Sequence, residues 1–158
     1  MISHFKSPGS DGIVEVLPTL GFEIEEILLP QGGKGLVFDC GGGFRYREMW
    51  DHFVGECHGV IYVIDCTDRD RMCVVKENIS LFFKHQLLKN KPVVFFFNKY
   101  DAPRSIPKDD LKRVLQLDKK RIAQPFKIVL GNSVTAEYRN HFTKKFAISV
   151  PVHPHRAD

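Results

Sequence analysis

An amide, a lysine and a carboxylate follow an apolar run near the middle of the chain. Residues 98–101 (Asn-Lys-Tyr-Asp) come directly after the run 93–97, which reads Val-Val-Phe-Phe-Phe. A carboxylate only accepts hydrogen bonds, so Asp101 can take two donors from one planar edge of a base, which guanine offers and adenine does not. The stem of Lys99 can lie across the base, and the amide of Asn98 can tie neighbouring loops together. The motif favours a guanine-binding site over an ordinary polar turn.

A second group of residues has the chemistry to bind phosphate and magnesium. Asp39 can hold Mg²⁺ through water, and the backbone N–H of Gly42, which no side chain obstructs, can approach a terminal phosphate. Thr19 precedes both along the chain, and its hydroxyl can complete the magnesium shell. The alternatives are a flexible loop for the adjacent glycines at 41–43 and a plain turn around Thr19.

An earlier glycine cluster at residues 31–35 (Gln-Gly-Gly-Lys-Gly) looks superficially like a phosphate loop. It lacks the G-x-x-x-x-G-K-[ST] spacing, and it leads into an apolar run where a phosphate loop must open a helix. We therefore predict a hairpin turn at this cluster. The glycines assigned to phosphate are Gly41 and Gly42.

Apolar periodicity predicts the elements that must position these residues. Strands are expected over residues 22–29, 36–38, 59–65, 93–97 and 125–130, and helices over 44–54, 69–90 and 107–117. The first two strands form a hairpin, and the later strands alternate with helices, which is typical of an α/β fold with a mostly parallel sheet. We expect the strand 59–65 to be buried on both sides. Ligands in such folds bind at the carboxyl ends of the strands, where the candidate residues lie.

Composition and charge limit the number of domains and the classes of partner that we expect. The chain has 158 residues, 43% of them hydrophobic, which suits one globular domain, predicted over 13–148 between a flexible leader at 1–12 and a flexible tail at 149–158. The net charge is only +4 and no run of five Lys and Arg occurs, so nucleic acid is not an expected partner. Ile2 excludes N-myristoylation, which makes membrane association doubtful, and we expect a cytoplasmic monomer. The four singly spaced cysteines are expected to be reduced and buried.

Together these motifs resemble the small GTPases, and in particular their ADP-ribosylation-factor (Arf) branch. Residues 18–22 (Pro-Thr-Leu-Gly-Phe) are similar to switch I of that branch, and residues 39–42 to the start of its switch II. The segments 44–52 and 60–72, with the motif at 98–101, most resemble the ciliary Arf-like GTPases associated with Bardet-Biedl syndrome. The resemblance implies a three-layer, P-loop small-GTPase fold and a GTP-dependent regulatory switch in ciliary or vesicular protein trafficking.

The resemblance also implies ligands, partners and site residues. The cofactors would be GTP or GDP and Mg²⁺, the partners effector and coat proteins of ciliary trafficking (BBSome-like), and the location the cytoplasm, the cilium base or a membrane. The metal would be held by Thr19 and Asp39. The implied nucleotide contacts are Thr19, Asp39, Gly42, Asn98, Lys99, Asp101 and Leu130. The implied partner surface consists of Phe22, Phe44, Tyr46 and Trp50, with core packing the favoured alternative for Trp50.

The sequence departs from the family pattern around the phosphates. The few polar residues before Ile13 leave no room for the first strand, the phosphate loop and the first helix, so we expect a small-GTPase fold that lacks them. Gly43 stands where the family has a water-positioning glutamine, and no catalytic residue is assigned. Weak nucleotide binding and impaired hydrolysis are expected.

Two other functions compete with the GTP-dependent switch. One is a nucleotide-free pseudo-GTPase interaction module or a defective truncated product. The other is a dinucleotide-binding oxidoreductase that uses the glycines at 41–43, although these do not complete the G-x-G-x-x-G pattern.

Overall fold

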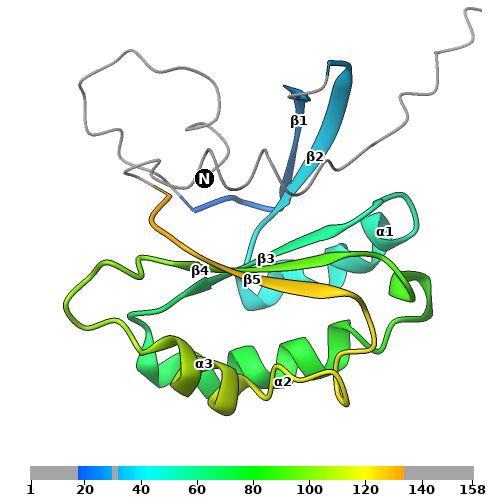
Figure 1. Cartoon of the computed structure of the whole chain (residues 1–158). Coiled ribbons are helices and arrows are strands. Elements are labelled where there is room, and N and C mark those ends of the chain that lie inside the picture. Colours follow the sequence, from blue (N-terminus) through cyan, green and yellow to red (C-terminus); the bar gives the residue numbers. More distant parts are fainter. Residues whose placement is uncertain (1–17, 30–31, 134–158) are drawn as a thin grey trace, which may run out of the picture. The chain divides into compact units, whose positions relative to one another are not determined.

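The computed structural model describes residues 18–29 and 32–133 (Figure 1). The chain divides into two compact units, the first Met1–His58 with Arg139–Asp158 and the second Gly59–Tyr138. The predicted leader, the predicted tail and the predicted ends of the folded domain lie outside the described residues.

A β-hairpin forms the sheet of the first unit. β1 (Phe22–Leu28) pairs antiparallel with β2 (Lys34–Cys40) in one unbroken register. Gly32 and Gly33 have φ angles of 84° and 90°, in the left-handed region that glycine adopts without steric cost. The N–H of Gly32 donates to the Leu29 carbonyl at 2.9 Å, which closes the turn. The hairpin turn predicted for this glycine cluster is confirmed over its described residues.

Two elements of the first unit differ from their predicted bounds. The strand expected over 36–38 is too short, because antiparallel pairing bonds backbone groups whatever the side chains, and Asp39 therefore lies inside β2. The single helix expected over 44–54 consists of a 3₁₀-helix, η2 (Phe44–Met49), followed by α1 (Trp50–Val54). No side chain caps η2, and its first turn closes by the tighter i to i+3 bond from the residue 46 N–H to the residue 43 carbonyl.

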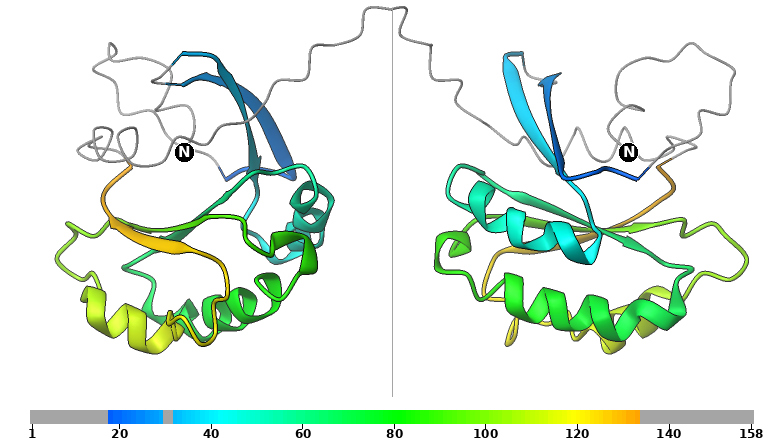
Figure 2. Two further views of the ribbon diagram at one scale, coloured as in Figure 1. Left: turned by 45° about the vertical axis from the view of Figure 1, so that its right-hand side comes forward. Right: turned by 180° about the vertical axis from the view of Figure 1, so that it is seen from behind.

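The second unit is a parallel sheet with helices packed against it. β3 (Val60–Asp65), β4 (Val93–Asn98) and β5 (Phe126–Leu130) pair in the order β3-β4-β5. α2 (Met72–Phe82) and α3 (Lys108–Leu115) lie on the same face of this sheet (Figures 1 and 2). The α/β class, with parallel strands and one antiparallel hairpin, is as predicted.

The helix expected over 69–90 is wrong as one continuous element. It is divided into η3 (Arg69–Arg71), α2 and η4 (Gln86–Leu88). The backbone of His85 is extended, and its Nδ1 accepts the Leu87 N–H at 3.3 Å, which starts a new turn. Leu88 becomes fully buried as a result. The apolar spacing continued past Phe82, but the hydrogen-bond ladder did not.

β4 is the core of the second unit. Val93–Phe97 is buried along its whole length, whereas Val63 of β3 is 38% exposed, so the prediction that β3 is buried on both sides is wrong. Among the described residues, β3 pairs on one side only, while β4 pairs on both. The ring of Phe95 lies 5.5 Å from that of Phe83 and 5.6 Å from that of Phe126. Burying one such side chain stabilises the fold by about 1.5–3 kcal/mol, which fixes the strand and hence its carboxyl end.

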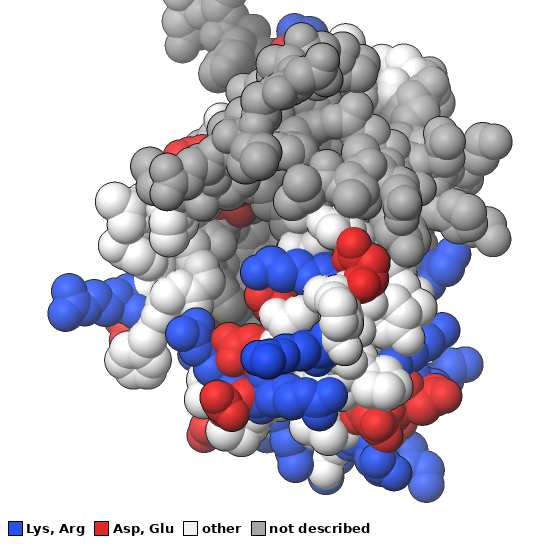
Figure 3. Space-filling model, turned by 90° about the vertical axis from the view of Figure 1, so that its left-hand side faces the viewer, with Lys and Arg blue, Asp and Glu red and all other residues white. Residues whose placement is uncertain are grey.

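Lys and Arg alternate with Asp and Glu over the described residues on the face shown in Figure 3, without a continuous basic stripe there. None of the helices in the described part of the chain is both long and apolar enough to cross a membrane. The cysteines are not all buried as expected, since Cys73 is exposed and only Cys66 is buried. Burial and the neighbouring Asp65 raise the pKa of the Cys66 thiol to about 12.

Candidate functional site

The carboxyl end of β4 is held by the side chain of Asn98, the last residue of the strand. Its Oδ1 accepts the backbone N–H of Lys99 at 2.9 Å and that of Ser133, also at 2.9 Å. Because Ser133 follows β5, this amide ties the loops after β4 and β5 together. Two backbone donors that the strand ends would leave open are satisfied by one side chain.

Asp101 is tied to the same neighbouring loop. Its Oδ2 accepts from the Asn132 Nδ2 at 2.9 Å. Backbone hydrogen bonds join the same two segments: the Tyr100 N–H donates to the Gly131 carbonyl at 3.1 Å, and the Gly131 N–H donates to the Phe97 carbonyl at 2.9 Å. The carboxylate of Asp101 is exposed and has several further lone-pair positions. It can therefore accept donors from a base edge while its orientation is already set.

Lys99 is oriented by the end of β3. Its backbone has a φ of 55°, and its Nζ lies 2.7 Å from the Asp65 Oδ2. The other carboxylate oxygen of Asp65 accepts the Thr67 N–H at 2.9 Å and its hydroxyl at 2.7 Å. Burial opposes ionisation of Asp65, but the hydrogen bonds from Lys99 and Thr67 outweigh it and hold the pKa of this carboxyl below its usual range. The aliphatic stem of Lys99 is thus positioned by an ion pair at its tip.

The other candidate residues lie in the first unit, at the carboxyl end of β2. The Gly41 N–H donates to the Gly21 carbonyl at 2.8 Å, which continues the hairpin by one bond. A Cβ at Gly41 would lie 2.6 Å from the Thr19 carbonyl oxygen, closer than real contacts allow. Only glycine fits there, and the close approach brings the Thr19 backbone to the start of the glycine segment.

Gly42 differs from its neighbour. A Cβ there would meet nothing within 4 Å, and its backbone N–H has no partner within the described residues. The carbonyls in this segment are engaged, since the Arg47 Nε donates to Gly42 at 3.1 Å and the Trp50 Nε1 to Gly41 at 3.1 Å. Within the described ranges the segment therefore presents an unbonded N–H while its carbonyls accept from other donors, which is the polarity that suits an anion.

Asp39 carries a carboxylate that is harder to ionise than a free one. Burial raises the pKa of this carboxyl, and the nearby Glu23 and Glu25 raise it further. Glu23 is its cross-strand partner in the hairpin. No group of three His, Cys, Asp or Glu side chains within the described ranges could hold a metal ion, so the assignment of Mg²⁺ to Thr19 and Asp39 stays a prediction.

Comparison with known proteins decides the family. A model of the ADP-ribosylation factor family matches residues 6–147. The chain belongs to this family. The Arf-family chain is 31% identical over 132 residues to ADP-ribosylation factor-like protein 6 of Danio rerio, which covers 82% of this chain and 70% of that protein.

Two further Arf-family proteins are similar to this chain. ADP-ribosylation factor J of Dictyostelium discoideum is 31% identical over 126 residues, 77% of this chain and 66% of that protein. ADP-ribosylation factor-like protein 14 of Mus musculus is 31% identical over 104 residues, 65% of this chain and 54% of that protein, so the matched part is under two thirds of both relatives.

The structure of the Arl6 BBS3 small GTPase from Trypanosoma brucei with bound nucleotide analogue GppNp superposes with a TM-score of 0.71 at 28% identity, covering 82% of this chain and 79% of that chain. The expected small-GTPase fold is confirmed by this likeness. The position of this chain in the Arf-like group, predicted from the motifs, is confirmed as well.

Sequence reasoning missed polar residues of the second unit. Leu130, the predicted contact, is half-buried at the end of β5 and pairs with Phe97, while Asn132 and Ser133 make the polar contacts to the β4 loop. Asp65 was also missed as the partner of Lys99. The signal in the sequence was position, because Asp65 ends one strand adjacent to β4, and Asn132 and Ser133 follow the other.

The predicted partner surface is only partly exposed. Phe44 is 84% exposed, and Phe22 is 41% exposed although its ring lies 4.8 Å from that of Phe53. Tyr46 and Trp50 are half-buried against the glycine segment, with Trp50 bonded to it. The two phenylalanines remain available to a partner, whereas the other two aromatic residues support the fold of the first unit.

Proposed function

We propose that this Arf-family chain is a guanine-nucleotide-dependent regulatory switch whose base specificity resides in Asp101. The observation that supports it is that Asp101 is hydrogen-bonded to Asn132, and Asn98 to Ser133, so that both side chains are oriented by the chain itself. A recognition edge whose orientation is already fixed loses little conformational entropy on binding. Lys99, held by its ion pair, supplies an aliphatic surface for the face of the base.

Phosphate and magnesium would be bound by the first unit. The free N–H of Gly42 suits a terminal phosphate, and the hydroxyl of Thr19 with the carboxylate of Asp39 offers the oxygen ligands that Mg²⁺ prefers. Burial is the main cause of the raised pKa of Asp39, with Glu23 and Glu25 adding to it, and a bound cation would favour the ionised carboxylate against both effects. When bound, Mg²⁺ neutralises charge on the phosphates.

We propose that nucleotide binding by these 158 residues is weak and that hydrolysis is impaired. The sequence contains no G-x-x-x-x-G-K-[ST] loop, and Gly43 has no side chain to orient a water molecule. Losing three charge-assisted hydrogen bonds at about 1.5–3 kcal/mol each weakens binding by roughly 5–9 kcal/mol, which brings a tight site to about the millimolar range.

Isothermal titration of the chain with GTP, ATP and XTP in the presence of Mg²⁺ tests the base assignment. GTP should bind at least about tenfold more tightly than ATP, and Asp101→Asn should weaken GTP and favour XTP, because the amide presents a donor where guanine also presents one. Asp109→Asn, an exposed helix residue that loses the same charge, is the matched control. Equal affinity for GTP and ATP in the parent chain would overturn the assignment.

We further propose a role in ciliary or vesicular protein trafficking, with the chain in the cytoplasm and recruited to the cilium base or a membrane by effector or coat proteins. The likeness to proteins named Arl6 supports this role. The full chain carrying a fluorescent tag should concentrate beside γ-tubulin in ciliated cells, and Phe44→Asp should disperse it. Lys112→Asp, on an exposed helix position, is the control. A uniform distribution of the parent would contradict the proposal.

An interaction module that works without nucleotide is the second candidate. The exposure of Phe44 and Phe22 favours it, because a partner can use these side chains whether or not a nucleotide is bound. Recruitment that persists in Asp101→Asn but is lost in Phe44→Asp would support this alternative. Loss of recruitment in both variants would support the nucleotide-dependent switch.

A further inference from the structure

A cavity of about 310 Å³ lies in the second unit between α2 and the segment that joins α3 to β5. Four of its lining residues are cations, Lys76 and Lys84 from α2 and its end, and Lys120 and Arg121 from the joining segment. None of its lining residues is acidic. The cavity is distinct from the residues assigned to the guanine base, which lie at the carboxyl end of β4.

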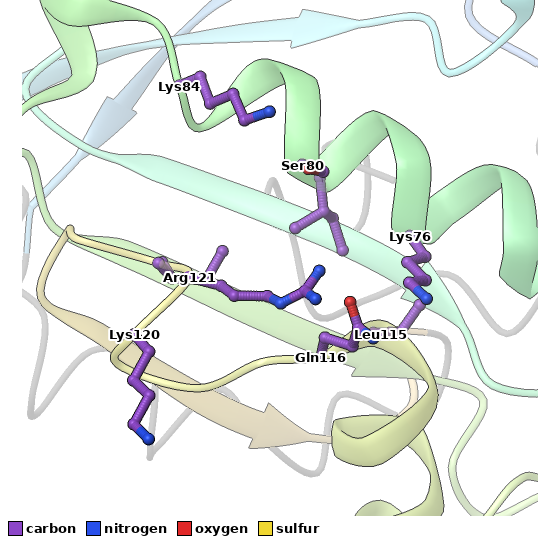
Figure 4. A pocket seen from close by; sticks show the side chains of 9 residues that line it. Lys76, Ser80, Lys84, Leu115, Gln116, Lys120 and Arg121 are labelled. Carbon is purple, nitrogen blue, oxygen red and sulfur yellow. The ribbon is translucent and has the colours of Figure 1, made fainter.

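The positive charge of this cavity is uncompensated within the described residues. Lys76, Lys84, Lys120 and Arg121 make no ion pair there, in contrast to Arg113, which is paired with a carboxylate 2.6 Å away. In Figure 4 the ends of Lys76 and Arg121 point toward Gln116 from opposite sides, whereas Lys120 points away. Two cations converging on one volume without an acid favour occupancy by an anion.

Gln116 adds a requirement that a simple anion does not meet. It follows α3 with a φ of 54°, a left-handed conformation in which glycine would cost nothing and glutamine is strained. Its Oε1 is buried and has no hydrogen-bond partner among the residues that the structure describes. A carbonyl oxygen needs a donor, so an occupant that satisfies it must carry a hydroxyl or N–H group.

The floor of the cavity is apolar. Ile79 of α2, Leu115 at the end of α3 and Ile122 line it and belong to the buried core of the unit. The carbon face of a ring can lie on such a floor while polar substituents point to the rim. The volume is at the lower end of the range for small-molecule sites, about 300–1,000 Å³.

We propose that this cavity binds a phosphorylated polyol, with phosphate held by Lys76 and Arg121 and a ligand hydroxyl donating to the Oε1 of Gln116. Lys84 and the hydroxyl of Ser80 lie on the same rim and can contact a second phosphate. The inference does not rest on the nucleotide function, because it uses none of the residues assigned to guanine or to Mg²⁺.

Isothermal titration of the chain with inositol trisphosphate tests the charge requirement. Lys76→Gln with Arg121→Gln should weaken binding about tenfold or more. The matched control is Lys112→Gln with Lys119→Gln, which removes the same charge from exposed positions that do not line the cavity and should change affinity less than about twofold. Equal losses in the two double variants, or no binding by the parent, would overturn the proposal.

Gln116→Gly separates a built site from general attraction of anions. Glycine keeps the left-handed backbone and removes the whole side chain with its acceptor, so inositol trisphosphate should bind several-fold more weakly, while inorganic phosphate, held by Lys76 and Arg121, should bind as before. An unchanged affinity for inositol trisphosphate would overturn the role of Gln116. Asp101→Asn should leave this binding unchanged, and a loss in that variant would show that the ligand occupies the guanine site instead.

A vesicle-binding assay distinguishes a lipid headgroup from a soluble phosphorylated polyol as the ligand. Vesicles of phosphatidylcholine with phosphatidylinositol bisphosphate, compared with vesicles of phosphatidylcholine alone, present the same headgroup on a lipid. Binding to these vesicles that is lost in the Lys76→Gln, Arg121→Gln variant assigns a lipid headgroup. Binding only to free inositol trisphosphate assigns a soluble phosphorylated polyol.

Discussion

The carboxyl ends of β2 and β4 both carry predicted nucleotide contacts, but they are built in different ways. At the end of β4 the side chains bond one another and their neighbours, as in Asn98 with Ser133 and Asp101 with Asn132. At the end of β2 the contacts are made by backbone carbonyls, and the Asp39 carboxylate makes no hydrogen bond or ion pair within the described residues.

This difference separates two kinds of recognition. On the predicted base side, the side chains are oriented by hydrogen bonds within the chain itself, which lowers the entropy cost of binding the proposed base. On the predicted phosphate side, the Gly42 N–H and the Asp39 carboxylate have no partner within the described residues, and the proposed anion and cation would supply one to each. Four predictions test this contrast, in order of decreasing effect.

Gly41→Ala should have the largest effect, because the contact it disrupts is with backbone that cannot move aside. The added Cβ would lie 2.6 Å from the Thr19 oxygen and 3.1 Å from that of Gly21, and we expect a loss of about 2–3 kcal/mol. Gly42→Ala, with nothing within 4 Å, should cost under about 0.5 kcal/mol. Urea unfolding followed by the fluorescence of Trp50 measures both. Similar losses would show that the two glycines are not distinguished by packing.

Asn98→Ala should lower the free energy of unfolding by about 1–3 kcal/mol, because it leaves two backbone N–H groups without an acceptor. Hydrogen exchange gives a second measurement, in which the Ser133 amide loses its protection. Asn78→Ala is the control, since that amide donates only to a carbonyl on its own exposed helix turn. A Ser133 amide that stays protected would mean that the loops are joined by other contacts.

Asp65→Asn and Asp39→Asn should have opposite signs, each of about 1 kcal/mol or less given their solvent exposure. The pKa of Asp65 is lowered by folding, so its stabilisation is present at neutral pH and is lost as the pH falls below about 4. The pKa of Asp39 is raised, so its ionised form destabilises the fold at neutral pH and the penalty disappears on acidification. Urea unfolding at neutral and acidic pH should show Asp65→Asn less stable, and Asp39→Asn more stable, than the parent only at the higher pH. The same sign for both would refute the contrast.

Gly43→Gln should change stability least, within about 0.5 kcal/mol. Gly43 has an ordinary φ of −63° and ψ of 147°, and an added Cβ would meet the Tyr46 ring at 3.4 Å, which is normal contact. Thermal unfolding beside the parent measures this. A loss as large as that of Gly41→Ala would show that the segment tolerates no side chain at all.

The sequence predicted the structure best where polar residues with a recognisable chemistry directly follow an apolar strand. Asn98 and Asp101 could be placed at the carboxyl end of β4 because a buried apolar run led directly into polar residues of a recognisable spacing. The hairpin turn followed from its glycines in the same way. These features depend on neighbours along the chain, which a sequence displays.

The remaining features depend on tertiary register and could not be derived. Asn132 reaches Asp101 across the pairing of β4 with β5, in which Phe97 lies opposite Leu130. Asp65 reaches Lys99 across the pairing of β3 with β4, in which Asp65 lies opposite Asn98. Periodicity likewise continued the second helix past Phe82, whereas burial of Leu88 required the chain to turn. Each of these features depends on packing between segments that are distant in the sequence.

The parallel sheet also constrains the kinetics of folding. Val60 pairs with Val93 and Val93 with Phe126, so either pairing must close a loop of 33 residues. Because the two loops have the same length, the entropy cost of closing them is the same. Loop closure therefore favours neither the β3–β4 nor the β4–β5 pairing in the transition state. Non-local contacts of this kind slow folding, and Phe95, whose ring contacts Tyr62 of β3 and Phe126 of β5, can bring both neighbouring strands to β4.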